Sequence, residues 1–95
     1  MTIKEQGNIL NIEGNIKSIE DFEQIKTAVD GVLNVYDSII LNIKDSISLI
    51  SSVIGYLMKL TKNEDKRIYV NVGSDDLYNL LDELNLVNEF FLKKI

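Results

Sequence analysis

The first strand-like pattern lies near the start of the chain. Ile9–Glu13 alternates between apolar and polar positions, with Leu10 and Ile12 on one face. The trio Gln6-Gly7-Asn8 before it is turn-forming, and the residues from Ile3 onward alternate loosely. We therefore predict a short hairpin whose better strand is Ile9–Glu13.

Three further stretches have the pattern of strands. Ser38–Ile43 is short, rich in isoleucine and flanked by charge, so we expect a central strand that is buried on both faces. Lys66–Val72 alternates and is typical of a strand. Glu89–Lys93 can supply a last strand through Phe90 or Phe91.

Helical spacing appears in the segments between these strands. Ser18 is a good N-cap with Asp21 three residues later, and it precedes an apolar face at Ile19, Phe22, Ile25, Val29 and Val32. A second helix, from about Ser52 to Leu60, is apolar nearly all round, and its Gly55 suggests close approach to the sheet. A third follows Gly73-Ser74, with a core stripe at Leu77, Leu80, Leu81 and Leu84.

Strands that alternate with helices imply right-handed βαβ crossovers and a mostly parallel sheet. We therefore expect an α/β fold with four to five strands and about three helices. The 95 residues fit one domain, residues 1–95, without a linker or repeat, and the 45% hydrophobic and 26% charged content is ordinary for such a domain.

Composition narrows the range of functions. The chain has no cysteine and no histidine, so thiol chemistry, the usual zinc site and an imidazole base are excluded, and we expect no metal or cofactor. The net charge of −5 and the lack of a continuous basic patch argue against nucleic acid as a partner. No apolar run is long enough for membrane insertion and no leader pattern is seen, so we expect a cytoplasmic protein.

The most informative chemistry lies at the start of the second helix. Ser51 and Ser52 occupy a place where backbone N–H groups lack partners and the helix dipole is positive. Such a pair can cap the helix, bind an anion or carry a phosphate. The carboxylates Asp45, Asp75 and Asp76 show no pairing that indicates acid–base or metal chemistry, and we interpret the last two as ordinary helix-start acids.

The order of the elements, and the unit of strand, serine pair and helix, resemble the STAS domain, best known from bacterial anti-sigma factor antagonists. The family's central motif reads approximately apolar strand, Asp-Ser-Ser-Gly-Leu-Gly, apolar helix. Here Leu41-Asn42-Ile43 stands on the strand, and Ile50-Ser51-Ser52-Val53-Ile54-Gly55 stands on the motif without a gap. An earlier signature, apolar-x-Gly-Glu-apolar-Asp, falls on Ile12-Glu13-Gly14-Asn15-Ile16-Lys17. The resemblance covers essentially the whole chain, without the family's usual C-terminal helix.

In such antagonists, a protein kinase that is itself the anti-sigma factor phosphorylates the first serine of the pair. The resemblance therefore implies a non-enzymatic regulator of transcription that binds an anti-sigma factor with an ATPase-fold kinase domain and is switched by phosphorylation at Ser51. The partner-binding surface that we expect comprises Asn15, Lys17, Ser18, Ser51, Ser52, Val53 and Tyr56. For Val53, Tyr56 and Met58 two interpretations stay open: apolar helical residues of the core, or an exposed apolar patch beside Ser51 that docks the partner.

The motif departs from the family pattern near the expected phosphosite. The Asp before the serines is Ile50, the Gly after them is Val53, and the upstream acidic positions are Asn15 and Lys17. These substitutions remove negative charge, which favours a bound or covalent anion near Ser51. They also remove an Asp that can align the serine hydroxyl in the active site of a kinase. Both consequences stay open.

A second reading keeps the fold and changes the role. Small STAS proteins also serve as non-enzymatic subunits bound to the ATPase of ABC-type lipid transporters, and there the serine pair would be a cap or a contact. An enzyme is the weakest reading, because the chain has no histidine, no cysteine and no glycine-rich phosphate loop.

Overall fold

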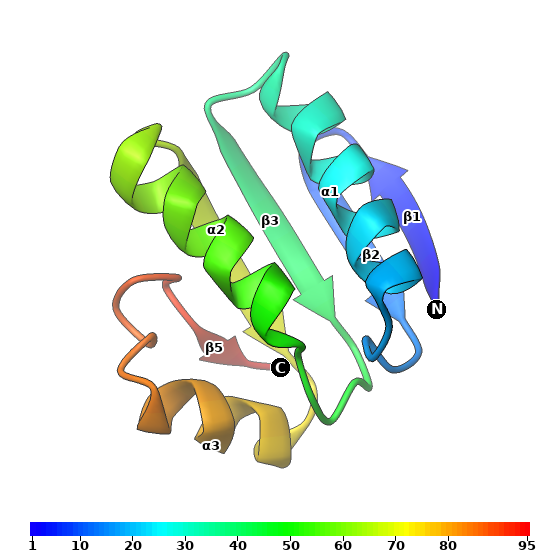
Figure 1. Ribbon diagram of the computed structural model, residues 1–95, viewed down its shortest axis with the longest axis vertical. Coiled ribbons are helices and arrows are strands. Elements are labelled where there is room, and N and C mark those ends of the chain that lie inside the picture. Colours follow the sequence, from blue (N-terminus) through cyan, green and yellow to red (C-terminus); the bar gives the residue numbers. More distant parts are fainter.

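A five-stranded sheet forms the frame of the molecule, and three helices pack on it (Figure 1). The structure is a computed structural model that describes residues 1–95. The strands lie in the order in which they occur in the chain, with β1 antiparallel to β2 and the others parallel, as expected. The elements are β1 (Thr2–Gln6), β2 (Ile9–Glu13), α1 (Ile19–Leu33), β3 (Ser38–Ile43), α2 (Ser51–Asn63), β4 (Arg67–Val72), α3 (Asp75–Glu83) and β5 (Lys93–Lys94).

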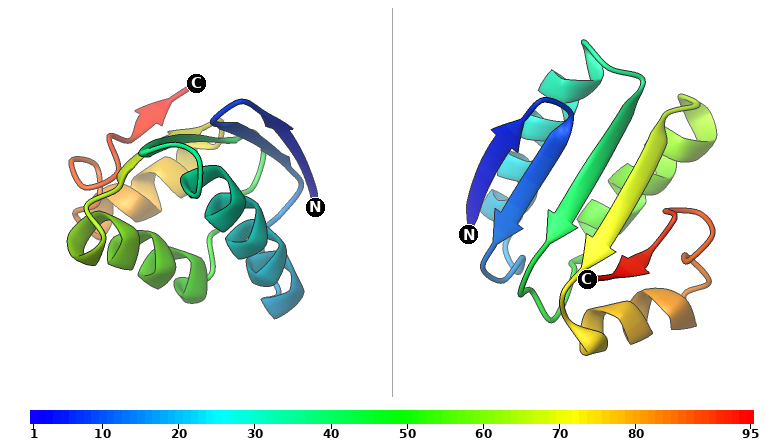
Figure 2. Two further views of the ribbon diagram at one scale, coloured as in Figure 1. Left: turned by 90° about the horizontal axis from the view of Figure 1, so that it is seen from above. Right: turned by 180° about the vertical axis from the view of Figure 1, so that it is seen from behind.

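All three helices cover the same face of the sheet. Figure 2 shows the sheet from above and from behind, and in both views its second face carries no helix. The strand order explains this arrangement, because each new strand adds to the same side of the previous one. Right-handed crossovers that always advance in one direction must place every helix on one face.

The core fills the space between the covered face and the helices. Along β3, Ile39, Leu41 and Ile43 are buried against the helices, whereas Ile40 and Asn42 are half-buried on the uncovered face. The prediction that this strand is buried on both faces was therefore wrong. An isoleucine-rich run satisfies either arrangement, and the one-sided topology decides between them.

The helix starts differ in their capping. The Ser18 hydroxyl accepts a hydrogen bond from the N–H of Asp21, and the Asp21 carboxylate accepts one from the N–H of Ser18. This capping box confirms the predicted start of α1. Ser74 caps α3 by accepting from the N–H of Leu77. In α2 the N-cap is Ile50, and no side chain caps the helix. The helix also continues to Asn63, about one turn beyond the predicted end.

A few apolar positions lie elsewhere than expected. Ile19 and Leu84, assigned to helix core stripes, are 60% and 48% exposed because each lies at an end of its helix. The last strand is only Lys93–Lys94, and Phe90 before it is fully buried in a turn. No helix has both the length and the apolar character needed to cross a membrane.

Candidate functional site

Two loops meet at the carboxyl ends of β2 and β3. One loop follows β2 and leads into α1, and the other follows β3 and leads into α2. An isolated parallel bridge pairs Ile16 of the first loop with Leu49 of the second. This bridge brings the upstream signature next to the serine-pair segment, so the structure places the two motif regions together.

Side chains reinforce this contact between the loops. Asp45 accepts a hydrogen bond from the N–H of Gly14 at 2.7 Å, and Asn15 accepts one from the N–H of Ile47 at 3.2 Å. Asp45 therefore has a structural role in the loop contact. Asn15, expected as a partner contact, uses its amide oxygen inside the domain while the residue stays exposed.

Ser46 is the one polar residue that is fully buried, and the sequence did not reveal its role. Its hydroxyl accepts a hydrogen bond from the N–H of Ile16 at 3.0 Å and donates one to the carbonyl of Ser48 at 2.6 Å. It therefore links the two loops from within. Neither of these loops has a periodic pattern, so nothing local distinguishes Ser46 from its neighbours.

Ser51 and Ser52 form the first turn of α2 without capping it. Ser51 is exposed and Ser52 is half-buried, and the N–H groups of Val53 and Ile54 both donate to the carbonyl of Ile50. The cap interpretation of the serine pair is thus wrong. The pair remains available at the positive end of the helix dipole.

The neighbouring residues of the predicted surface have separate roles. Ser18 is half-buried and committed to capping α1. The N–H of Lys17 donates to the carboxylate of Asp21, and this bond, with those from Ser18, lowers the pKa of Asp21. The side chain of Lys17 is exposed and joins none of the ion pairs of the chain.

Two apolar members of the predicted surface face the domain interior. Val53 is only 1% exposed and belongs to the hydrophobic core, so its assignment as a partner contact was wrong. Tyr56 is half-buried between α2 and α1, where its ring meets Phe22 edge-on at 6.0 Å between centroids. Its hydroxyl donates to Asp30, and burial together with this bond raises the pKa of Tyr56.

Gly55 lies on the exposed side of α2. A methyl group built on its Cα would meet no other atom within 4 Å, so the predicted close approach to the sheet is absent. Ser51, Gly55 and Lys59 follow one another at a spacing of four residues, and all three are exposed. They form a stripe along α2, which we call the α2 stripe.

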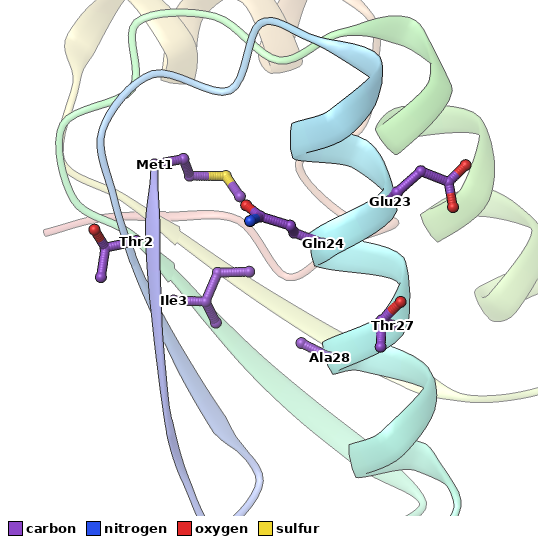
Figure 3. Close-up of a pocket in the computed structure, with 7 residues that line it drawn as sticks. All are labelled: Met1, Thr2, Ile3, Glu23, Gln24, Thr27 and Ala28. Atoms are coloured by element: carbon purple, nitrogen blue, oxygen red, sulfur yellow. The ribbon is translucent and has the colours of Figure 1, made fainter.

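A groove lies elsewhere in the molecule, away from the candidate site. It has a volume of about 630 Å³ and lies between β1 and α1 (Figure 3). Met1, Ile3 and Ala28 lie between strand and helix, whereas Glu23 points away from β1. None of the predicted site residues lines this groove, and it is the seam between an edge strand and its helix.

The chain matches no protein-family model, no curated protein and no solved structure at a significant level. The resemblance to the STAS domain therefore rests on the quoted motif residues and the order of the elements.

Proposed function

We propose that this chain is a non-enzymatic, partner-binding regulator that resembles an anti-sigma factor antagonist. The α2 stripe and the adjoining loop with Asn15 and Lys17 dock on an anti-sigma factor with an ATPase-fold kinase domain. Phosphorylation of Ser51 by that kinase then weakens the complex. In this role the chain acts in the cytoplasm of a bacterium and frees a sigma factor.

One observation carries this proposal. The α2 stripe starts with an exposed serine that caps nothing and continues with a glycine that no internal contact requires. A glycine inside a helix costs about 1 kcal/mol relative to alanine. Residues that contribute nothing to the fold, or weaken it, are understandable when a partner contacts them.

The topology supports binding more than catalysis. In open α/β sheets, ligands bind in the crevice where the strand order reverses. Here the order β1-β2-β3-β4-β5 never reverses, so no such crevice is formed. The carboxyl ends of β2 and β3 instead lead into the two contacting loops.

The charge on a phosphoserine is sufficient for a switch. It carries about −1.5 to −2 charges, and a unit charge about 4 Å from a partner carboxylate costs roughly 4 kcal/mol at an effective dielectric of 20. Even about 3 kcal/mol corresponds to roughly a hundredfold loss of affinity. A phosphate on Ser51 can therefore release a partner while the domain stays folded.

The experiment combines partner binding with phosphorylation. The tagged chain is used to isolate partners from its source organism, and the isolated kinase is incubated with the chain and Mg-ATP. Intact mass and peptide mapping should show one phosphate on the wild type and on the Ser52→Ala variant, and none on Ser51→Ala. Phosphate at another residue, or no phosphate and no kinase-fold partner, would sink the proposal.

The same isolation of partners tests the alternative role as a subunit bound to the ATPase of a lipid transporter. A partner that is the ATPase of an ABC-type lipid transporter, bound equally by the wild type and by Ser51→Glu, would favour that role. Genes for a permease and an ATPase beside the coding sequence would point the same way.

A further inference from the structure

The uncovered face of the sheet has an ordered pattern of side chains. Five positions lie in register across all five strands, one from each strand: Lys4, Asn11, Asn42, Asn71 and Lys93. Because side chains alternate between faces, this row and the residues two positions away share the uncovered face. We call this surface the open face, and Figure 2 shows it from behind.

The three asparagines form a hydrogen-bonded ladder. The amide of Asn42 donates to Asn11 at 3.0 Å, and the amide of Asn71 donates to Asn42 at 2.9 Å. Each amide group uses part of its hydrogen-bonding capacity in the ladder and keeps the rest for outside partners. A lysine flanks the ladder at each end, on β1 and on β5.

An apolar row lies beside the ladder, over β3, β4 and the turn before β5. Ile40 and Tyr69 are neighbours in register, and the ring of Phe91 stacks on Tyr69 with 4.9 Å between centroids. Together with Asn71, Lys93 and Ile95 they line a shallow depression of about 320 Å³. The open face therefore contains an apolar hollow with polar and cationic borders.

Phe91 occupies this place at a conformational cost. Its φ is +46°, in the left-handed region that bulky residues rarely adopt, yet half of its surface is exposed. A strained backbone that keeps a large apolar ring in solvent is unfavourable for the isolated domain. Such strain is typical of sites that contact a ligand or partner.

The charges of the open face indicate the kind of partner. Its strands carry three cations, Lys4, Arg67 and Lys93, and one carboxylate, Glu13. None of the three cations joins an ion pair within the chain, although the chain as a whole has a net charge of −5. The strands of the open face thus carry more cations than carboxylates on an acidic molecule, although Asp37, Glu64 and Asp65 line the pocket at Arg67. The cations on these strands are the complement of an acidic surface.

The same charges argue against a second copy of the chain as the occupant. Two open faces stacked about a two-fold axis along the row would place Lys4 on Lys4 and Lys93 on Lys93. An axis along the strands would place Lys4 on Lys93. Either arrangement brings like charges together, which disfavours the pairing.

We propose that the open face is a second docking surface, which binds an amphipathic helix of a protein partner with acidic residues flanking its apolar stripe. Parallel sheets occur almost only with helices on both faces, so a helix is the element that this face lacks. Its apolar side chains enter the depression beside Phe91, and its carboxylates meet Arg67 and Lys93. This surface is separate from the α2 stripe, so it does not depend on the function proposed above.

The probes are two designed helical peptides of about 15 residues, long enough for partial helicity. Both have leucines at i, i+3, i+4 and i+7, and one carries glutamates where the other carries lysines. In a backbone-amide NMR titration of the full chain, the acidic peptide should shift the resonances of Tyr69, Asn71 and Lys93. The basic peptide should leave them unmoved, because its charges oppose those of the open face.

Variants locate the binding surface. Reversing two charges with Arg67→Glu and Lys93→Glu should weaken the acidic peptide about tenfold or more, whereas the matched pair Lys59→Glu and Lys62→Glu on α2 should not. Phe91→Asn removes the ring and keeps a residue that tolerates positive φ, so it should weaken binding while the domain stays folded.

Several results would overturn the proposal. These are no binding of the acidic peptide, equal binding of both peptides, and shifts that map to the α2 stripe. Tighter binding of a single-stranded oligonucleotide to the open face would show that its partner is a nucleic acid and not a helix. Self-association in sedimentation that is lost in the double variant Arg67→Glu with Lys93→Glu would show that the partner is a second copy of the chain.

Discussion

The hydroxyl of Tyr56 on α2 donates a hydrogen bond to the carboxylate of Asp30 on α1. The nitrogen of Lys26 lies 3.0 Å from the same carboxylate, and it also lies 5.7 Å from the centre of the Tyr56 ring. This cluster joins the two helices that flank the centre of the sheet. It explains why Tyr56, expected as a partner contact, is engaged within the domain.

Tyr56→Phe tests the contribution of this hydrogen bond to stability. The variant keeps the ring that packs on Phe22 and removes only the donor. Because Asp30 is partly exposed, we expect a loss of about 1 kcal/mol in the free energy of unfolding at neutral pH, below the usual range for hydrogen bonds to charged groups. Urea unfolding measures it, with Tyr78→Phe on α3 as the control. A loss of similar size in both variants would contradict this assignment.

The pH dependence of that loss follows from the two pKa shifts. Burial and the bond to Asp30 raise the pKa of Tyr56, so its contribution is present below about pH 10 and lost as the pH rises further. Partial burial raises the pKa of Asp30, but the hydrogen bonds from Tyr56 and Lys26 outweigh this effect, so the pKa is lowered. Its contribution is present above about pH 4 and lost in stronger acid. The difference between wild type and Tyr56→Phe should therefore shrink at both extremes.

The three helix starts give a comparison within one molecule. Ser18→Ala and Ser74→Ala each remove a side-chain cap, and each should cost about 1 kcal/mol. Ser51→Ala removes no capping bond, so it should change stability by less than about 0.5 kcal/mol. Thermal or urea unfolding of the three variants checks this order. A cost for Ser51→Ala equal to that of the other two would restore the cap reading.

Ser46 should matter for stability more than any other loop hydroxyl. Ser46→Ala leaves the buried N–H of Ile16 without its acceptor, and we expect a cost of about 2 kcal/mol. Ser48→Ala, two residues away and exposed, is the matched control and should be nearly neutral. Amide exchange of Ile16 should also accelerate in Ser46→Ala. Unchanged exchange there would show that the bridge between the loops does not depend on this hydroxyl.

The difference between what was predictable and what was not has a physical basis. The bounds of β3 and the start of α1 were predictable, because an isoleucine run and a capping box are local signals. The exposure of one face of β3 was not predictable, because this exposure depends on the order in which the strands add to the sheet. The role of Ser46 depends on a loop 30 residues away, which no local pattern encodes.

The candidate site shows the same division at residue level. An apolar helix with little polar pattern does not reveal which side faces the sheet, so Val53 was assigned to the surface although it is buried. Serine is a favoured cap, so the pair was assigned to that role as one of three readings. Instead α2 begins at Ser51, and its N-cap is Ile50, a partly buried residue that packs against the core.

Gly55 gives the sharpest separation of stability from binding. Gly55→Ala adds a methyl group that meets nothing within 4 Å, so the variant should be more stable by about 1 kcal/mol. If the α2 stripe docks a partner, the same methyl group should weaken that complex, because it enlarges the surface next to Ser51. Gly31→Ala in α1 is the matched control, since its methyl group also meets nothing within 4 Å. It should stabilise the domain equally and leave partner affinity unchanged. Calorimetry of both variants with the isolated partner measures the two effects, and equal affinities would remove Gly55 from the docking surface.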